Sequence, residues 1–165
     1  MPTRTAAAKK PCDGASRPLS AREMAAWHAL IRSHSRIVRV LEAELEAEHE
    51  LSLPAYEVLA HLSEASGRRL RMSDLATCAV LTPSGLTRLV DKLATDGLVE
   101  RTRCDADARV VYAQLTDQGA AKLADAYPTH LRGVREHYID QLSAAQLAAV
   151  ADALMPLAVV CRGEA

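Results

Sequence analysis

Hydrogen-bonding side chains recur along one face of the segment TPSGLTRLVDKLATDG, which runs from Thr82 to Gly97. If the segment is a helix, its spacing places two hydroxyl and two cationic side chains on one face: Ser84, Thr87, Arg88 and Lys92. Arginine can read guanine through two hydrogen bonds, and hydroxyls bind phosphates or either kind of base edge. The face therefore has the chemistry of a DNA contact, although polar helix faces are more often only solvated, and Arg88 has a competing role as an ion-pair partner of Asp91 or Glu57.

The same segment carries the signals that begin and end a helix. Thr82 is a good N-cap, and Pro83 suits the first turn, where a missing N–H costs nothing. Gly97 supplies a left-handed stop. An apolar stripe opposite the polar face is expected to pack on the protein: Leu86, Leu89, Val90 and Leu93.

The flanking sequence predicts a winged helix. Residues 72–80 (MSDLATCAV) form a short predicted helix, and a tight turn at Val80-Leu81 leads into the next helix, which is the helix-turn-helix pattern. After Gly97 the runs VERTR and RVVYAQL have strand composition and are joined by a polar tip at 104–108. Leu70 is predicted to lie in a short third strand.

Taken together, these motifs resemble the MarR family of bacterial transcription regulators over about residues 20–160. The matching pieces are L-x-x-Y-x-x-L at 53–59, SDLA at 73–76, LTRLVDKLATDGLVER at 86–101, the wing D-x-R at Asp107 and Arg109, and LTDQG at 115–119. Many relatives have Arg where this chain has Ala108. This departure predicts fewer contacts from the wing.

The resemblance implies a mainly α fold with a small antiparallel β-wing, in a homodimer that binds a palindromic operator. It implies a repressor that a small aromatic or phenolic ligand releases from DNA. The implied DNA-binding residues are Ser84, Thr87, Arg88, Lys92, Arg101, Arg103 and Arg109, with Asp107 orienting the last of these. The ligand-pocket candidates are Trp27, His28, His34 and His61. His34 lies on an otherwise apolar seam, so it is expected to have a buried hydrogen-bond partner or to face a cavity.

Long helices are predicted on both sides of the winged helix. Capping boxes at Ser20/Glu23 and Ser143/Gln146 begin the first and last of them. A helix from Asp117 to about Tyr138 is expected to be kinked or interrupted at Pro128. We expect a disordered tail at 1–18 and one domain at 19–165, with dimerisation helices at 19–50 and 117–165 and a DNA-binding lobe at 54–115 whose first helix spans 54–64.

Composition limits the remaining classes of protein. The 165 residues carry a net charge of −1, yet residues 68–109 hold eight basic and six acidic side chains, so positive charge is local. The sequence contains no run of about 18 apolar residues, so no membrane span is predicted. The N-terminus lacks the apolar segment of a secretory signal. A cytoplasmic protein is expected. Neither a phosphate-binding loop nor a catalytic triad motif is found, so no enzyme and no cofactor are predicted.

Three alternatives remain open at this stage. Cys104 lies beside Arg101 and Arg103, where positive charge favours a reactive thiolate and a redox-responsive regulator. His130 and His137 share a helix face and, with further ligands, could bind zinc, although no metal site is assigned. The third alternative is a winged-helix scaffold for protein interactions that has lost DNA binding. Binding to DNA that does not depend on salt would indicate this alternative.

Overall fold

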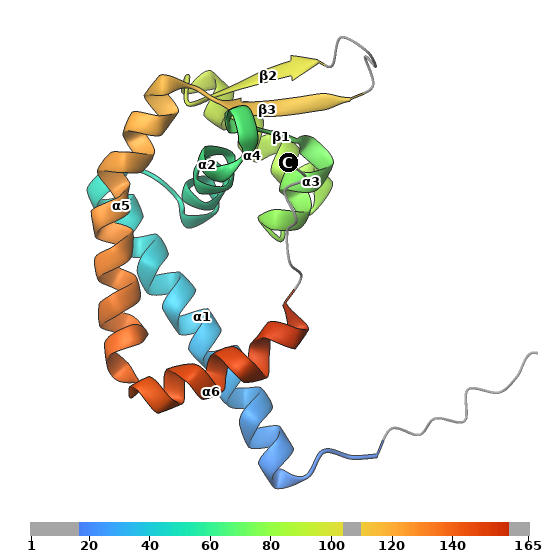
Figure 1. The fold of residues 1–165 in the computed structure, drawn as a ribbon, viewed down its shortest axis with the longest axis vertical. Coiled ribbons are helices and arrows are strands. Elements are labelled where there is room, and N and C mark those ends of the chain that lie inside the picture. The colour runs from blue at the N-terminus through green and yellow to red at the C-terminus, as the bar shows by residue number, and fades with distance from the viewer. Residues whose placement is uncertain (1–16, 104–109, 159–165) are drawn as a thin grey trace, which may run out of the picture. The chain divides into compact units, whose positions relative to one another are not determined.

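The computed structural model describes residues 17–103 and 110–158, which divide into two compact units, one ending at His34 and the other beginning at Ser35. Figure 1 shows the elements in chain order: α1 (Ala21–His49), α2 (Leu53–Glu64), β1 (Arg69–Arg71), α3 (Met72–Cys78), α4 (Pro83–Thr95), β2 (Val99–Arg103), β3 (Val111–Leu115), α5 (Asp117–His137) and α6 (Ala144–Leu154). Short 3₁₀ turns lie at Ser66–Arg68, Ile139–Gln141 and Met155–Leu157. The fold is mainly helical with one small sheet.

Side-chain caps start the helices where the sequence predicts them. The Thr82 hydroxyl accepts a hydrogen bond from the Gly85 amide at 3.1 Å, and α4 ends just before Gly97, whose φ is 73°. Both capping boxes are present, at the starts of α1 and α6. The predictions for these helix ends are confirmed.

The helix-turn-helix is made by α3 and α4. Helix α3 ends at Cys78, two residues earlier than predicted. The reason is that Val80 adopts a φ of 51°, which takes the chain out of the right-handed helix. Val80 is also 90% exposed, so the turn holds a β-branched residue in a costly backbone conformation without burying it.

The three strands form an antiparallel sheet in the order β1-β3-β2. The predicted third strand is confirmed, since Leu70 pairs with Ala113 of β3. On β2, Arg101 is also opposite Ala113, so these three side chains share the face that carries the core. Arg69 and Arg71 lie on the other face, with Tyr112.

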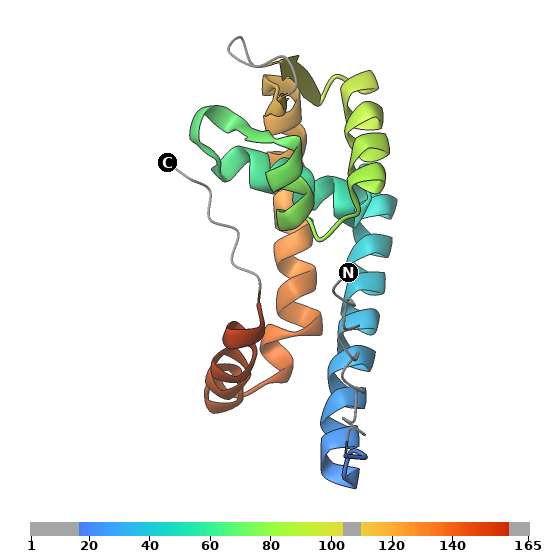
Figure 2. The same ribbon diagram turned by 90° about the vertical axis from the view of Figure 1, so that its right-hand side faces the viewer.

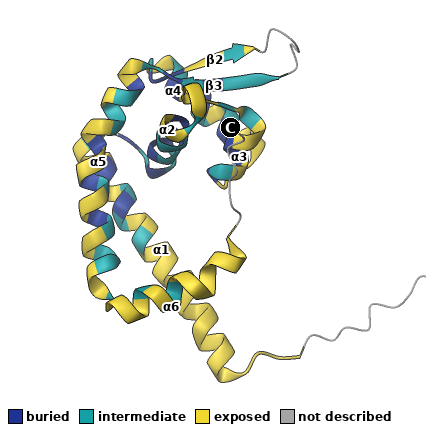
Figure 3. Cartoon of the chain, in the orientation of Figure 1, coloured by how far each residue is buried: buried dark blue, intermediate teal, exposed yellow. Residues whose placement is uncertain are grey.

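The core lies where α2, α3 and α4 pack together against this sheet, and the end of α1 and helix α5 add residues to it (Figure 3). Eight of its larger side chains are fully buried: Leu45, Leu59, Leu62, Leu75, Leu86, Val58, Val90 and Val99. Each such side chain stabilises the fold by about 1.5–3 kcal/mol through removal from water. They include the predicted stripe residues Leu86 and Val90, so the apolar face of α4 is fixed on the core and its polar face points outward.

The structure decides one of the two outcomes predicted at Pro128. Helix α5 runs from Asp117 to His137 with Pro128 inside it, so the predicted interruption is wrong, and the predicted kink stays a prediction. Proline removes one intrahelical hydrogen bond, the one to the carbonyl of Ala124. Both residues are exposed, so water can satisfy that carbonyl, and α5 continues alongside the second half of α1 (Figure 2).

Apolar side chains of the first half of α1 and of α6 are not covered in the single chain. Residues 21–36 are all exposed, and α6 has no buried residue. The larger exposed side chains in the two segments are Met24, Trp27, Leu30, Ile31 and Leu154. His34 is exposed with them. The expected buried hydrogen-bond partner of His34 is therefore absent among the described residues, because the whole segment 21–36 is exposed.

Candidate nucleic-acid interface

The polar face of α4 is exposed, as the sequence predicts. Ser84 is exposed, and its hydroxyl lies 3.5 Å from that of Thr82. Thr87 is half-buried, and its hydroxyl donates a hydrogen bond to the Pro83 carbonyl at 2.9 Å, which leaves the oxygen free to accept another. Arg88 is exposed and forms no ion pair with any residue of 17–103 or 110–158. Its guanidinium is therefore available to a ligand.

Arg101 and Arg103 extend from β2 beside α4. The Arg101 guanidinium forms an ion pair with the Asp91 carboxylate on α4, so Asp91 is paired with Arg101 rather than with Arg88. Arg103 is exposed at the last position of β2 and is opposite Val111. The structure thus joins Arg101 to the α4 surface through a carboxylate partner, whereas Arg103 lies at the far end of β2.

Lys92 is exposed at the margin of the α4 face. It lines a cleft of about 330 Å³ behind α4, together with Leu89 and Leu93. Lys122 of α5 and Asp96 lie along the same cleft. Lys92 is therefore shared between the outward face of α4 and this cleft, a position that the sequence alone did not predict.

The remaining predicted wing residues lie outside the described part of the chain. These are Cys104, Asp107, Ala108 and Arg109. The redox hypothesis for Cys104 and the wing contact of Arg109 therefore stay predictions.

A second basic group on the sheet was missed by the sequence reasoning. The Arg69 guanidinium lies 5.1 Å from the centre of the Tyr112 ring, and the Arg71 Nε donates a hydrogen bond to the Tyr112 hydroxyl at 3.4 Å. The alternation Arg-Leu-Arg at 69–71 was the available signal, because it places two arginines on the same face of a strand. Only the pairing of β1 with β3 places Tyr112 opposite Arg71 and in contact with both arginines.

The predicted ligand-pocket residues belong to both units of the chain, so their role stays a prediction. Trp27, His28 and His34 are exposed and belong to the unit that ends at His34. His61 is half-buried on α2, in the other unit. None of the four lines the cleft behind α4.

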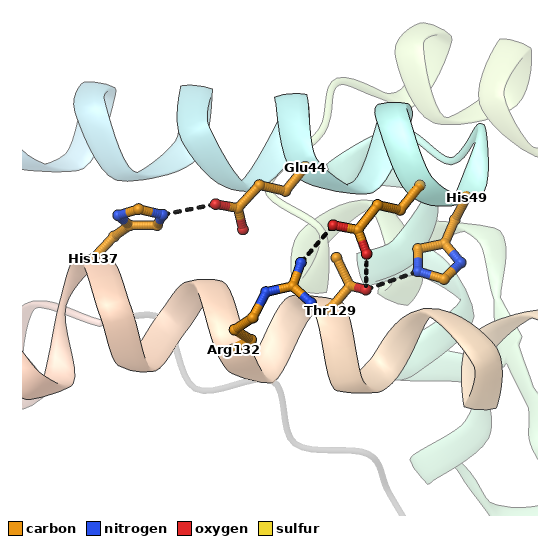
Figure 4. A network of polar contacts seen from close by, with 6 residues as sticks. Glu44, His49, Thr129, Arg132 and His137 are labelled. Atoms are coloured by element: carbon orange, nitrogen blue, oxygen red, sulfur yellow. Dashed lines mark hydrogen bonds and ion pairs between the residues drawn. The ribbon is translucent and has the colours of Figure 1, made fainter.

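Polar contacts join the second half of α1 to α5 (Figure 4). The buried Thr129 hydroxyl donates to Glu48 Oε2 at 2.8 Å and lies 2.9 Å from His49 Nε2. Arg132 donates to the other Glu48 oxygen at 2.5 Å. The hydrogen bond from Thr129, followed by the contact with Arg132, lowers the pKa of Glu48. The acidic end of α1 is therefore matched by polar and basic groups of α5.

Gly133 of α5 lies close against Glu44 and Leu41 of α1. His137 Nε2 lies 2.7 Å from Glu44 Oε1, and the other Glu44 oxygen is buried without a partner among the described residues. A Cβ at position 133 would be 2.4 Å from that oxygen and 2.6 Å from Leu41. A glycine at 133 leaves the space that the Glu44 carboxylate occupies.

The two histidines considered for zinc have separate environments. His137 contacts Glu44, whereas the His130 ring stacks on Tyr56 with centroids 4.3 Å apart. Burial lowers the pKa of His130, and its Nδ1 is buried without a partner in the described chain. In the part of the chain that the structure describes, no three His, Cys, Asp or Glu side chains are grouped as metal ligands.

The described geometry is that of a winged helix-turn-helix protein, and comparison with known proteins assigns its family. Residues 49–110 match the model of the MarR family. AbsC, a MarR family regulator from Streptomyces coelicolor, is 34% identical, and its structure superposes with a TM-score of 0.80 over 86% of this chain and 95% of AbsC. The chain belongs to the MarR family of transcriptional regulators, which is not a family of enzymes.

Other relatives agree with this assignment. Sco3205 from the same organism, a MarR family regulator solved in complex with DNA, is 31% identical, with a TM-score of 0.82 over 86% of this chain and 89% of Sco3205. The transcriptional repressor YetL of Bacillus subtilis is 34% identical over 94 residues, which are 55% of this chain and 56% of YetL. The chain spans about half the length of the curated relatives it matches. Within the described residues, no helix is both long and apolar enough to cross a membrane.

Proposed function

We propose that this protein is a sequence-specific DNA-binding regulator, a homodimeric repressor that leaves a palindromic operator when a small ligand binds. The observation that carries the proposal is the outward face of α4. There Arg88 is exposed without an ion-pair partner in the described chain, while the opposite face is buried in the core. A helix fixed in this way can enter the major groove and present an arginine to a base edge.

Each predicted contact has a separate role in this proposal. Arg88 reads a base, most favourably guanine, and Ser84 and Thr87 bind phosphates or base edges. Lys92 and Arg103 contribute positive charge toward the phosphates, and Arg109 of the wing reaches the minor groove. Arg101 lies beside this surface with its guanidinium paired to Asp91. Residues 54–115 form the DNA-binding lobe in this assignment.

The uncovered apolar side chains support a dimer. Large exposed apolar side chains that lie together mark interaction surfaces on soluble proteins, and five such side chains lie along residues 19–36, with Leu154 at the end of α6. Helices 19–50 and 117–165 are therefore assigned to dimerisation. A twofold dimer carries two α4 helices, and this arrangement fits a palindrome with two half-sites.

The cleft behind α4 is a candidate site for a small ligand. Its walls combine Leu89 and Leu93 with the amines of Lys92 and Lys122 and the carboxylates of Glu50 and Asp96. An aromatic or phenolic acid would place its ring on the leucines and its carboxylate at a lysine. A ligand here contacts the rear of α4, so it has a route to shift the conformation that binds DNA. Trp27, His28, His34 and His61 remain further candidates for ligand contact, and a cytoplasmic location follows from the proposed role.

The test is fluorescence anisotropy with a labelled duplex that the wild-type protein selects from a randomised library. Tight binding that weakens with salt and is stronger than binding to a scrambled duplex is expected. Arg88→Ala is expected to weaken binding to the selected duplex by about 10- to 100-fold, which corresponds to the 1–3 kcal/mol of one bidentate base contact. Arg135→Ala, which removes the same charge from an exposed position on α5, is the matched control. Equal binding of both duplexes would refute the proposal.

A further inference from the structure

The Asp91–Arg101 ion pair joins the outward face of α4 to the first strand of the wing. Because Arg101 is opposite the fully buried Ala113, its side chain leaves the sheet on the face where α4 packs. Its guanidinium contacts the Asp91 carboxylate there. The position of this arginine is therefore set by the sheet register and by a partner on α4.

Asp91 stands at an unfavourable position for a DNA-binding helix. It lies three residues after Arg88, and side chains three apart on a helix are neighbours. A free carboxylate at this position would repel phosphates and attract the Arg88 guanidinium along the helix. The contact with Arg101 supplies Asp91 with another cation and leaves Arg88 unpaired within the described chain.

We propose that Arg101 is a positioning residue that neutralises Asp91 and thereby keeps Arg88 available to DNA, rather than a phosphate ligand. The inference rests on the proposed function and refines the role of one residue of the same interface. The pair is partly exposed, at 36% for Arg101 and 54% for Asp91, so its contribution to folding is small. Its effect is expected in DNA affinity.

Four proteins distinguish the two roles of Arg101: the wild type, Arg101→Gln, Asp91→Asn and the double variant Asp91→Asn/Arg101→Gln. Their affinities for the selected duplex are measured by anisotropy over a range of KCl concentrations. Arg101→Gln is expected to lose about tenfold in affinity, because Asp91 is then free to attract Arg88. The double variant is expected to recover most of that loss and to keep the wild-type dependence on salt, because the competing carboxylate is gone. Asp91→Asn alone is expected to bind about as tightly as the wild type.

A phosphate ligand would give a different result. Loss of one phosphate contact lowers the slope of log affinity against log salt by about 0.9, and an added Asp91→Asn change would not restore it. A double variant that stays weak with this smaller slope would overturn the inference. Thermal unfolding of each variant shows whether a weak binder is still folded. Failure of the wild type to prefer its selected duplex would instead refute the proposed function, so the two failures are distinguishable.

Discussion

Gly119, in the first turn of α5, is expected to tolerate no side chain. A Cβ there would lie 2.1 Å from the Leu98 carbonyl oxygen and 2.8 Å from Leu115 Cδ1. The first of these is a backbone atom at the start of the wing, so it cannot move away by rotating a side chain. Gly119→Ala therefore forces α5 away from the segment that enters β2.

The change in the free energy of unfolding for Gly119→Ala is the sum of two opposing effects. Overpacking costs typically about 1–3 kcal/mol, and contact with backbone places Gly119→Ala at the upper end of that range. Replacing a helical glycine by alanine returns about 0.5–1 kcal/mol. The net loss in the free energy of unfolding is about 2 kcal/mol, which lowers the Tm by about 4–8 °C for a chain of this size.

Gly67→Ala is the comparison variant, since it adds the same methyl group elsewhere. A Cβ at Gly67 would have no atom within 4 Å, but the φ of this residue is 64°, so the cost there is only that of a left-handed alanine, about 1–2 kcal/mol. Both variants are measured by calorimetry at one fixed protein concentration, because the proposed dimer would make the Tm depend on concentration. Wild-type stability in Gly119→Ala would refute the reasoning. Recovery in Leu115→Val/Gly119→Ala would show that Leu115, not the carbonyl, is the obstacle.

Three further predictions concern the turn, a buried histidine and the exposed helices. Val80→Asn should raise the free energy of unfolding by about 1 kcal/mol, because asparagine tolerates a positive φ and the exposed Val80 side chain loses no burial; an unchanged urea midpoint would contradict this. Burial lowers the pKa of His130, so the unfolded chain binds that proton more readily and stability falls as the pH drops through about 6.5. His130→Phe should keep the stack on Tyr56 and flatten this decline in unfolding experiments between pH 7.5 and 5, whereas His28→Gln at an exposed position should not. Ile31→Asp should shift the protein toward monomers in sedimentation equilibrium and weaken DNA binding with little change in helix content, and a variant that remains dimeric would count against dimerisation through α1.

The local elements could be predicted because their signals are local. The caps of α1, α4 and α6 need only a side chain and an amide three residues away, and both are written in the sequence. The buried stripe of α4 follows from helical periodicity in the same way. The early end of α3 was missed, since a positive φ at a valine runs against its intrinsic preference and is held by the turn between two packed helices.

The candidate site also has features that local sequence predicts and features that depend on tertiary contacts. The pattern of apolar and polar residues is enough to predict which side chains α4 presents outward, because one face of an amphipathic helix must be buried and the other must not. Three contacts depend on tertiary packing: Asp91 pairs with Arg101 and not with Arg88, Tyr112 contacts two arginines, and Glu44 lies over Gly133. Each of these contacts joins elements far apart in the chain, so it depends on strand register and helix packing, which no local spacing of residues encodes.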